Sequence, residues 1–265
     1  MKDSSSVSTR DICSFWEANP LGASAIPYPL GTKEYFEFYD QLRQANESLE
    51  FSYRLHEYRN FADKKVLDVG CGNGYILSKY AQEGSKVCGI DITSAAIHLS
   101  RRRFELLNLP GAFFVANAEE LPFEDQAFDC VCSMGVLHHT PNTKKTVGEI
   151  YRVLKPGGRL IVMFYHRNSA LYRLKFSLIS LLTYKTIQQS VNEVDGVGNP
   201  KGDVYSKSEL RYLLRRFEEL DIFAGLLQGW MILPKLGRFI PNGLLRPFEK
   251  RWGWFVYAKG VKSTM

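Results

Sequence analysis

The stretch Asp68-Val69-Gly70-Cys71-Gly72-Asn73-Gly74 ends a short apolar run, 65–69, and leads into a helical pattern, 75–82. Glycines at positions 70, 72 and 74 let the backbone turn sharply and approach a ligand without Cβ clashes. The first N–H groups of a helix have no partner within that helix, so they can bind a ligand as well. The sequence therefore predicts a strand, a glycine loop and a helix that together hold a nucleotide-like molecule.

The glycine spacing and two carboxylates narrow the choice of ligand. The spacing is G-x-G-x-G, whereas dinucleotide-binding loops have G-x-G-x-x-G, and Tyr75 stands where their third glycine would be. This disfavours NAD-dependent oxidoreduction. Asp91 ends the next predicted strand about 20 residues on, a place from which a carboxylate binds both ribose hydroxyls. Asp68 would put a second carboxylate near a cationic or amine group of the ligand.

Strand-like and helix-like patterns alternate from residue 65 onward, which indicates βαβ units and a parallel sheet. The predicted strands that follow the first are 86–90, 112–116, 127–133 and 159–165. The predicted helices that follow 75–82 are 94–107, with Ser94 as its N-cap, and 144–154. The segment 155–158, Lys-Pro-Gly-Gly, stops the second of these helices.

Two regions do not fit the alternation, and they divide the chain. Residues 11–60 are rich in aromatic side chains, which predicts an N-terminal helical segment, 1–60, packed on the sheet domain, 61–265. Residues 168–205 combine an apolar helix with a glycine-containing loop, and we expect them to form a substrate-covering cap inserted after the fifth strand. Beyond the cap, Ser206 and Glu209 form a capping box for a helix to Arg216, and 251–258 is a final strand.

Composition excludes several classes of protein. The 265 residues are 45% hydrophobic and 23% charged, which is typical of a globular chain and not of a disordered or collagen-like one. A formal charge of +6 is too small to indicate nucleic-acid binding. The five cysteines lack C-x-x-C pairs, so we expect reduced thiols and no metal site. The polar first ten residues and the short apolar segment 176–182 predict neither export nor a membrane span, hence a cytoplasmic location.

Five motifs together resemble one family. VLDVGCGNG, GIDIT, ANAEELPFEDQAFD, GVLHHTPN and EIYRVLKPGG, spread over 66–164, are similar to those of class I S-adenosylmethionine-dependent methyltransferases, in the ubiquinone/menaquinone C-methylase-like branch of methyltransferase type 11. The resemblance implies an α/β fold with a doubly wound, mostly parallel, seven-stranded Rossmann-like sheet and helices on both faces. It also implies S-adenosylmethionine as cofactor and S-adenosylhomocysteine as product.

The resemblance assigns roles to individual residues. The glycine loop would face the methionine part of the cofactor, Asp91 its ribose, and Asn117 with Ala118 its adenine. Asn117 departs from the Asp that the family usually has, although its amide oxygen can still accept a hydrogen bond from the adenine amine. The full cofactor-binding prediction is Asp68, Gly70, Cys71, Gly72, Gly74, Asp91, Ile92, Asn117, Ala118, Glu119 and Ser133.

Candidate catalytic and substrate-binding residues are less specific. Methyl transfer from a sulfonium is largely in-line positioning, and a base is needed only if the nucleophile carries a proton. His138 and His139, after the fourth strand, are candidates for that base, or they only shape the pocket. Trp16, Tyr28, Tyr35 and Tyr39 would line the pocket or belong to the core. Substrate contacts are also predicted at Tyr165, His166, Arg167 and Tyr205, where the alternative for 165–167 is a solvated loop.

The sequence thus predicts a methyltransferase of a small molecule or modified peptide in specialised metabolism, with a partly apolar substrate that bears an acidic group. One alternative is C-methylation of a prenylated quinone at a membrane surface, which the 176–182 helix and a basic stretch would support. That stretch contains Lys235, Arg238, Arg246, Lys250 and Arg251. Another is a module that binds S-adenosylmethionine without turnover. The acceptor atom, oxygen, nitrogen or carbon, and the oligomeric state stay open.

Overall fold

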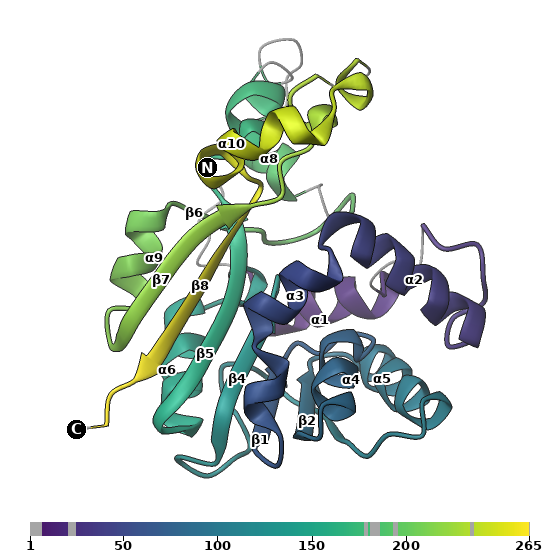
Figure 1. Ribbon diagram of the computed structural model, residues 1–265, viewed down its shortest axis with the longest axis vertical. Helices are drawn as coiled ribbons and strands as arrows, with labels where there is room; N and C mark the ends of the chain where they lie inside the picture. Colours follow the sequence, from purple (N-terminus) through teal and green to yellow (C-terminus); the bar gives the residue numbers. More distant parts are fainter. Residues whose placement is uncertain are drawn as a thin grey trace.

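One mixed β-sheet organises the chain. The computed structural model describes residues 7–20, 25–177, 180, 186–192, 196–233 and 236–264. Seven strands follow the order β3-β2-β1-β4-β5-β8-β7, and the short β6 pairs with β5 (Figure 1). Strands β1 to β6 pair in parallel and β8 runs antiparallel to β5 and β7. The strands are β1 Lys65–Val69, β2 Lys86–Asp91, β3 Ala112–Val115, β4 Phe128–Met134, β5 Leu154–His166, β6 Val204–Tyr205, β7 Phe217–Gly225 and β8 Phe255–Lys262. The seven-stranded, mostly parallel Rossmann-like fold is confirmed.

Helices cover both faces of this sheet because alternate strand residues are apolar on both sides. On one face, Val66, Cys130 and Cys132 pack against the helices α2 to α5. On the other, Leu67 and Val131 pack against α6 and α9. The helices are α1 Thr9–Ala18, α2 Lys33–Asn46, α3 Leu49–His56, α4 Tyr75–Gln82, α5 Ser94–Leu106, α6 Thr143–Val153, α8 Ile187–Asn192, α9 Lys207–Leu213 and α10 Asn242–Trp252.

The N-terminal helices complete the core rather than forming one of their own. Tyr35 and Phe36 of α2 lie in the same buried cluster as Tyr80 of α4 and Tyr257 of β8. Helix α1 is fastened to the start of α5, where both carboxylate oxygens of Glu17 accept hydrogen bonds from 94–95. This places α1 beside the carboxyl ends of the parallel strands.

Most element boundaries match the sequence prediction, with four corrections. Thr93, not Ser94, is the N-cap of α5, because its Oγ1 accepts from the Ala96 amide at 3.3 Å while Ser94 binds Glu17. Strand β5 begins at Leu154 and not at 159, because Leu154 already pairs with Phe128 of β4. The predicted capping box of α9 is confirmed, but the helix ends at Leu213. The final strand is Phe255–Lys262, and 251–252 closes α10, which the prediction missed together with β7.

A second group of segments lies beyond the upper end of the sheet in Figure 1. We call the described residues of 169–205 and 226–254 the cap. It contains a π-helical turn, 171–176, helices α8 and α10, and short 3-10 turns. Its inner side is a buried cluster that joins Tyr165 of β5 to Leu171, Tyr172, Val191, Leu226 and Met231. The cap therefore draws on the segment before β8 as well as on the predicted insertion, and part of the 176–182 segment falls outside the described residues. Within the described ranges, no helix is long and apolar enough to cross a membrane.

Candidate active site

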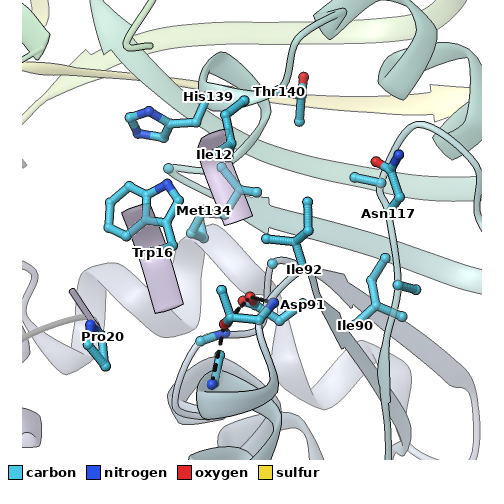
Figure 2. Close-up of a pocket in the computed structure, with 18 of the residues that line it drawn as sticks. Ile12, Trp16, Pro20, Ile90, Asp91, Ile92, Asn117, Met134, His139 and Thr140 are labelled. Carbon is cyan, nitrogen blue, oxygen red and sulfur yellow. Dashed lines mark hydrogen bonds between the residues drawn. The ribbon is translucent and has the colours of Figure 1, made fainter. Parts of the chain in front are cut away.

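A cavity with an empty volume of about 980 Å³, partly open to solvent, lies where the glycine loop, the ends of β2 and β4 and helix α1 meet (Figure 2). One end is formed by Gly72, Asp91 and Asn117, and the other by Trp16 and His139. The remaining lining residues are Ile12, Pro20, Gly70, Asn73, Ile90, Ile92, Thr93, Ala96, Leu99, Ala116, Ala118, Met134, Gly135, Val136, Thr140 and Pro141.

The glycine loop is held against β2 by its own backbone. The amides of Gly70 and Cys71 both donate to the Ile90 carbonyl, at 2.8 and 2.9 Å. Gly70 has a φ of +81°, and a Cβ there would lie 2.3 Å from Val136 Cγ2. A side chain at this position would therefore meet both an unfavourable backbone conformation and a filled space. The turn brings Gly70 and Gly72 to the cavity wall, as the sequence predicts.

Asp91 has its orientation fixed before any ligand arrives. Its Oδ2 accepts from the Gly72 amide at 3.1 Å, and its Oδ1 accepts from the amide and hydroxyl of Thr93 at 3.0 and 2.9 Å. Burial raises the pKa of Asp91, and the hydrogen bonds from Thr93 and Gly72 oppose that rise. A carboxylate oxygen has room for more than one donor, so Asp91 can still accept from hydroxyl groups at this end of the cavity.

Asn117 lies on the side of the cavity away from Trp16 and His139 (Figure 2), and Ala118 also lines the cavity. The Asn117 Oδ1 already accepts from the Glu119 amide at 3.0 Å, which leaves one lone pair for an amine of a ligand. Glu119 is buried outside the lining, and its Oε1 accepts from the Asn142 amide at 2.5 Å. Glu119 therefore joins the loop after β3 to the start of α6.

Besides Glu119, four more of the predicted cofactor residues lie behind the cavity wall. Ser133 Oγ donates to the Val69 carbonyl at 2.7 Å, Cys71 Sγ lies 3.5 Å from Ser100 Oγ, and Gly74 begins α4 with a φ of +78°. Asp68 is buried beneath the loop, where burial raises its pKa to about 8. Its Oδ1 has no hydrogen-bond partner among the described residues. These groups support the loop, and Asp68 also supplies a buried acceptor.

The two adjacent histidines differ in their surroundings. His138 is fully buried, its ring centroid 4.1 Å from that of Tyr165, and burial lowers its pKa well below the usual value. His139 lines the cavity, and its Nδ1 lies 2.5 Å from the Lys201 carbonyl. Because a carbonyl only accepts, this contact makes Nδ1 the protonated nitrogen and leaves the lone pair of the neutral ring on Nε2. Of the two candidates, only His139 lines the cavity.

Lys201 anchors the cap to the loop that follows β4. Its buried Nζ donates to the carbonyls of Thr140 and Pro141 at 2.7 and 3.0 Å, and it pairs with Asp203 at 3.1 Å. The Asp203 amide donates in turn to the His138 carbonyl at 3.0 Å. The sequence prediction missed Lys201, because nothing in the local pattern distinguishes a buried lysine in a glycine-rich loop from an exposed one.

Of the four N-terminal aromatics predicted to line the pocket, the structure brings one to it. Trp16 packs edge-to-face on His139, with ring centroids 5.2 Å apart. Tyr35 and Tyr39 are buried in the core under α2, since their rings pack on Phe36 and Tyr75. Tyr28 is exposed and packs on Phe38. Ile12 was missed, although its spacing of four residues from Trp16 puts both on one face of α1.

The remaining predicted substrate residues do not line the cavity. Tyr165 stacks on Trp254 inside the cap cluster, and His166 is buried with its Nδ1 3.0 Å from the Gly253 carbonyl. Arg167 forms two hydrogen bonds of 3.0 Å with Glu209, so its guanidinium already has a carboxylate partner. Tyr205 packs on Phe164. The expected grip on an acidic substrate group is thus not assembled from 165–167 in this arrangement.

Comparison with known proteins links this site to a domain family. Residues 67–162 match a family model described as a methyltransferase domain. A chloroplastic tocopherol O-methyltransferase of Arabidopsis thaliana is 39% identical over 137 residues, which are 48% of this chain and 38% of that protein. A demethylmenaquinone methyltransferase of Thermus thermophilus is 38% identical over 104 residues, 38% of this chain and 47% of that protein. The chain thus covers less than half the length of either relative.

Solved structures extend the likeness in fold to nearly the whole chain. The cyclase SpnF superposes with a TM-score of 0.59 at 16% identity, and the match covers 97% of both chains. A methyltransferase-like protein of Bacillus halodurans superposes with a TM-score of 0.57 at 20% identity, covering 81% of this chain and 100% of that one. At such identities the likeness concerns the fold, which hosts more than one kind of chemistry.

Proposed function

We propose that this chain, in which residues 67–162 match a methyltransferase domain, is a class I S-adenosylmethionine-dependent methyltransferase that transfers the methyl group of that cofactor to a small molecule. The observation that carries the proposal is one continuous cavity with two chemically different ends. The Asp91 and Asn117 end offers oxygen acceptors for a nucleoside, and the Trp16 and His139 end offers an aromatic wall and an imidazole.

The residues at the first end fit S-adenosylmethionine. Asp91 would hold the ribose hydroxyls, Asn117 the adenine amine, and the apolar side chains of Ile92 and Leu99 suit the faces of an adenine ring. The buried Asp68 Oδ1 lacks a donor, and an ammonium or amine is the kind of group that would supply one. When bound, the cofactor supplies an activated methyl group on a sulfonium.

His139 is the group that would remove a proton from the acceptor. A hydroxyl or amine nucleophile in the cavity would give its proton to Nε2 as the new bond to the methyl carbon forms and the carbon–sulfur bond breaks. The Lys201 carbonyl, by accepting from Nδ1, stabilises the imidazolium that results. Trp16 and α1 cover this end of the cavity and limit the access of water.

The second end of the cavity supports an apolar acceptor more than a peptide. Ile12, Trp16, Pro20 and Met134 give it a largely apolar surface. Tocopherol and demethylmenaquinone, the substrates in the names of the two relatives, are ring compounds with long apolar chains. We therefore favour a phenol or quinol with an apolar substituent, and methyl transfer to oxygen where a base is used or to ring carbon in a prenylated quinol.

Cofactor binding is the first test. Calorimetric titration with S-adenosylmethionine, S-adenosylhomocysteine and NAD should give binding of the two adenosyl compounds and none of NAD. The protein is then incubated with methyl-labelled S-adenosylmethionine and a panel of quinols, phenols and short peptides. Label in a quinol or phenol supports the proposal. Binding without transfer to any acceptor favours the non-catalytic module, and binding of NAD alone contradicts the methyltransferase proposal.

The second test separates the adjacent histidines. His139→Gln should lower turnover of a protonated acceptor by about 100-fold, the lower range for loss of a general base, and leave S-adenosylhomocysteine affinity unchanged. His138→Leu should keep turnover within a few-fold, because that ring does not reach the cavity. Equal losses in both variants would contradict the assignment of His139 as the base.

A further inference from the structure

Helix α10 has an apolar face that nothing described in the structure covers. Leu244, Phe248 and Trp252, four residues apart, lie along one side of the helix and are 67%, 47% and 37% exposed. The rings of Phe248 and Trp252 stack with centroids 5.4 Å apart. The opposite side is engaged with the protein, because Leu245 is buried and Glu249 Oε1 accepts from the Leu226 amide at 2.6 Å. The helix therefore needs only one of its faces to hold its place in the fold.

The surroundings of this face are basic. Arg246, Lys250 and Arg251 on α10 are exposed, and the only carboxylate of the helix, Glu249, points inward. Between Asp221 and the end of α10, Glu249 is the one acidic residue of the sequence. Leu236 and Phe239, in the turn that precedes α10 in the chain, are also exposed, at 67% and 68%.

This combination fits a particular kind of surface. An exposed apolar stripe that includes Trp and Phe, flanked by Lys and Arg, is the pattern of helices that lie in the interfacial region of a bilayer. Arg251 lies over the Trp252 ring at 5.9 Å, so its long side chain can follow the ring while the guanidinium stays at the headgroup level. A protein partner with an apolar groove would not require that the charged residues beside this face all be Lys and Arg.

We propose that α10 and the preceding turn, 236–252, form a docking surface for a lipid bilayer that carries anionic headgroups. The surface and the active-site cavity belong to connected parts of the fold. Leu245 of α10 packs with Ala170 and Leu227, whose neighbours in the chain, Leu171 and Leu226, belong to the cap cluster. That cluster also contains Tyr165, whose ring centroid lies 5.9 Å from that of His139. Docking through α10 would bring the acceptor end of the cavity to the side of the molecule that faces the lipid. The inference rests on α10 alone and stands whether or not the proposed methyl transfer is correct.

Vesicle sedimentation tests the proposal. The full chain is mixed with vesicles of phosphatidylcholine alone or of phosphatidylcholine with phosphatidylglycerol, at low and high salt. We expect binding only with phosphatidylglycerol, and weaker binding at high salt. Arg246→Gln with Lys250→Gln should weaken it about 25-fold, from roughly 5-fold per removed charge near an anionic surface. Phe248→Ser with Trp252→Ser should weaken it by at least about 10-fold.

Controls make each outcome decisive. Leu106→Ser with Leu107→Ser, at the C-terminal end of α5, removes two apolar side chains of similar exposure, 40% and 43%, and this variant should bind vesicles like the parent chain. Calorimetry with S-adenosylhomocysteine reports whether the variants keep their fold without depending on turnover. Equal binding to both kinds of vesicle, no binding to either, or full binding by both α10 variants overturns the proposal. So does a dimer in analytical ultracentrifugation that the Phe248 and Trp252 variant alone abolishes, since the face would then bind a second copy.

Discussion

The two halves of this molecule obtain their order in different ways. In the half that forms the Asp91 end of the cavity, residues 65–166, the decisive contacts are hydrogen bonds between residues close to strand ends, such as those that Asp91 accepts from the amides of Gly72 and Thr93. In the cap the decisive contacts are apolar, and they join residues far apart in sequence, such as Leu171 and Met231. Binding a common cofactor requires particular groups at particular turns, whereas covering a substrate requires only that suitable side chains pack together.

The largest expected effect is the loss of cofactor affinity when Asp91 is replaced. Asp91→Ala removes the acceptor for the ribose hydroxyls and also frees the Gly72 amide and the Thr93 hydroxyl from their partner. We expect S-adenosylhomocysteine affinity to fall by more than about 100-fold, since a charged acceptor of several hydrogen bonds is lost. Calorimetry measures the change, and Asp221→Ala on β7 is the control with unchanged affinity. A loss of S-adenosylhomocysteine affinity below 10-fold would contradict the assignment of Asp91 as the acceptor for the ribose hydroxyls.

Two glycines with a positive φ, one in each half, allow the effect of a substitution to be compared between the halves. Gly70 and Gly198 have φ values of +81° and +91°, but a Cβ meets Val136 at the first and nothing within 4 Å at the second. Gly70→Ala should therefore lower the free energy of unfolding by about 3 kcal/mol or more, and Gly198→Ala by about 1 kcal/mol. Urea denaturation of both variants gives the two values. Equal losses would show that backbone strain alone, not the close packing of the loop, limits position 70.

The difference between the halves explains what the sequence could predict. The glycine loop, Asp91 and the strands around them have local signals, because glycines at a turn and carboxylates at strand ends have few other uses. The side that faces the acceptor has no such signal. Trp16 and Tyr35 have similar surroundings in the sequence, yet one lines the cavity and the other is core, since helix orientation and not residue type decides between them.

The sequence analysis missed β7, α10 and Lys201 for the same reason, namely that their local sequence carries no clear signal. Strand β7, Phe-Glu-Glu-Leu-Asp-Ile-Phe-Ala-Gly, is an edge strand whose charged residues conceal its period. Helix α10 has Gly243 at its second position and Pro247 inside it, and both residues disfavour a helix in a sequence-based prediction. Contacts with β7 and the hydrogen bond from the Leu226 amide to Glu249 stabilise the helix. Lys201 is important through its burial, which only the folded chain creates.

His138, which is fully buried, makes the stability of the fold depend on pH. Burial lowers the pKa of His138 well below 6.5 in the fold, while the unfolded chain titrates near that value. As the pH falls below about 6.5 the unfolded state takes up the proton first, so stability that is present at neutral pH is lost. The loss should reach about 2 kcal/mol at pH 5. His138→Leu should remove that part of the acid sensitivity, measured by urea denaturation at pH 5 and pH 8. His98→Leu, an exposed position on α5, should not alter it.

The smallest expected effect concerns the link between the cap and the cavity. Lys201→Met removes the bonds from Nζ to the Thr140 and Pro141 carbonyls and leaves Asp203 without its ion pair. The Lys201 carbonyl remains, but the loop that holds it against His139 Nδ1 is less fixed, so both neutral tautomers of His139 become populated. We expect turnover to fall about 10-fold, in line with an indirect loss of positioning, with S-adenosylhomocysteine affinity unchanged. Nitrogen-15 spectra of the histidine rings would show the tautomer change, and Lys144→Met, exposed on α6, is the control. A drop in turnover with the His139 tautomer intact would mean that Lys201 acts through the stability of the cap and not through the base.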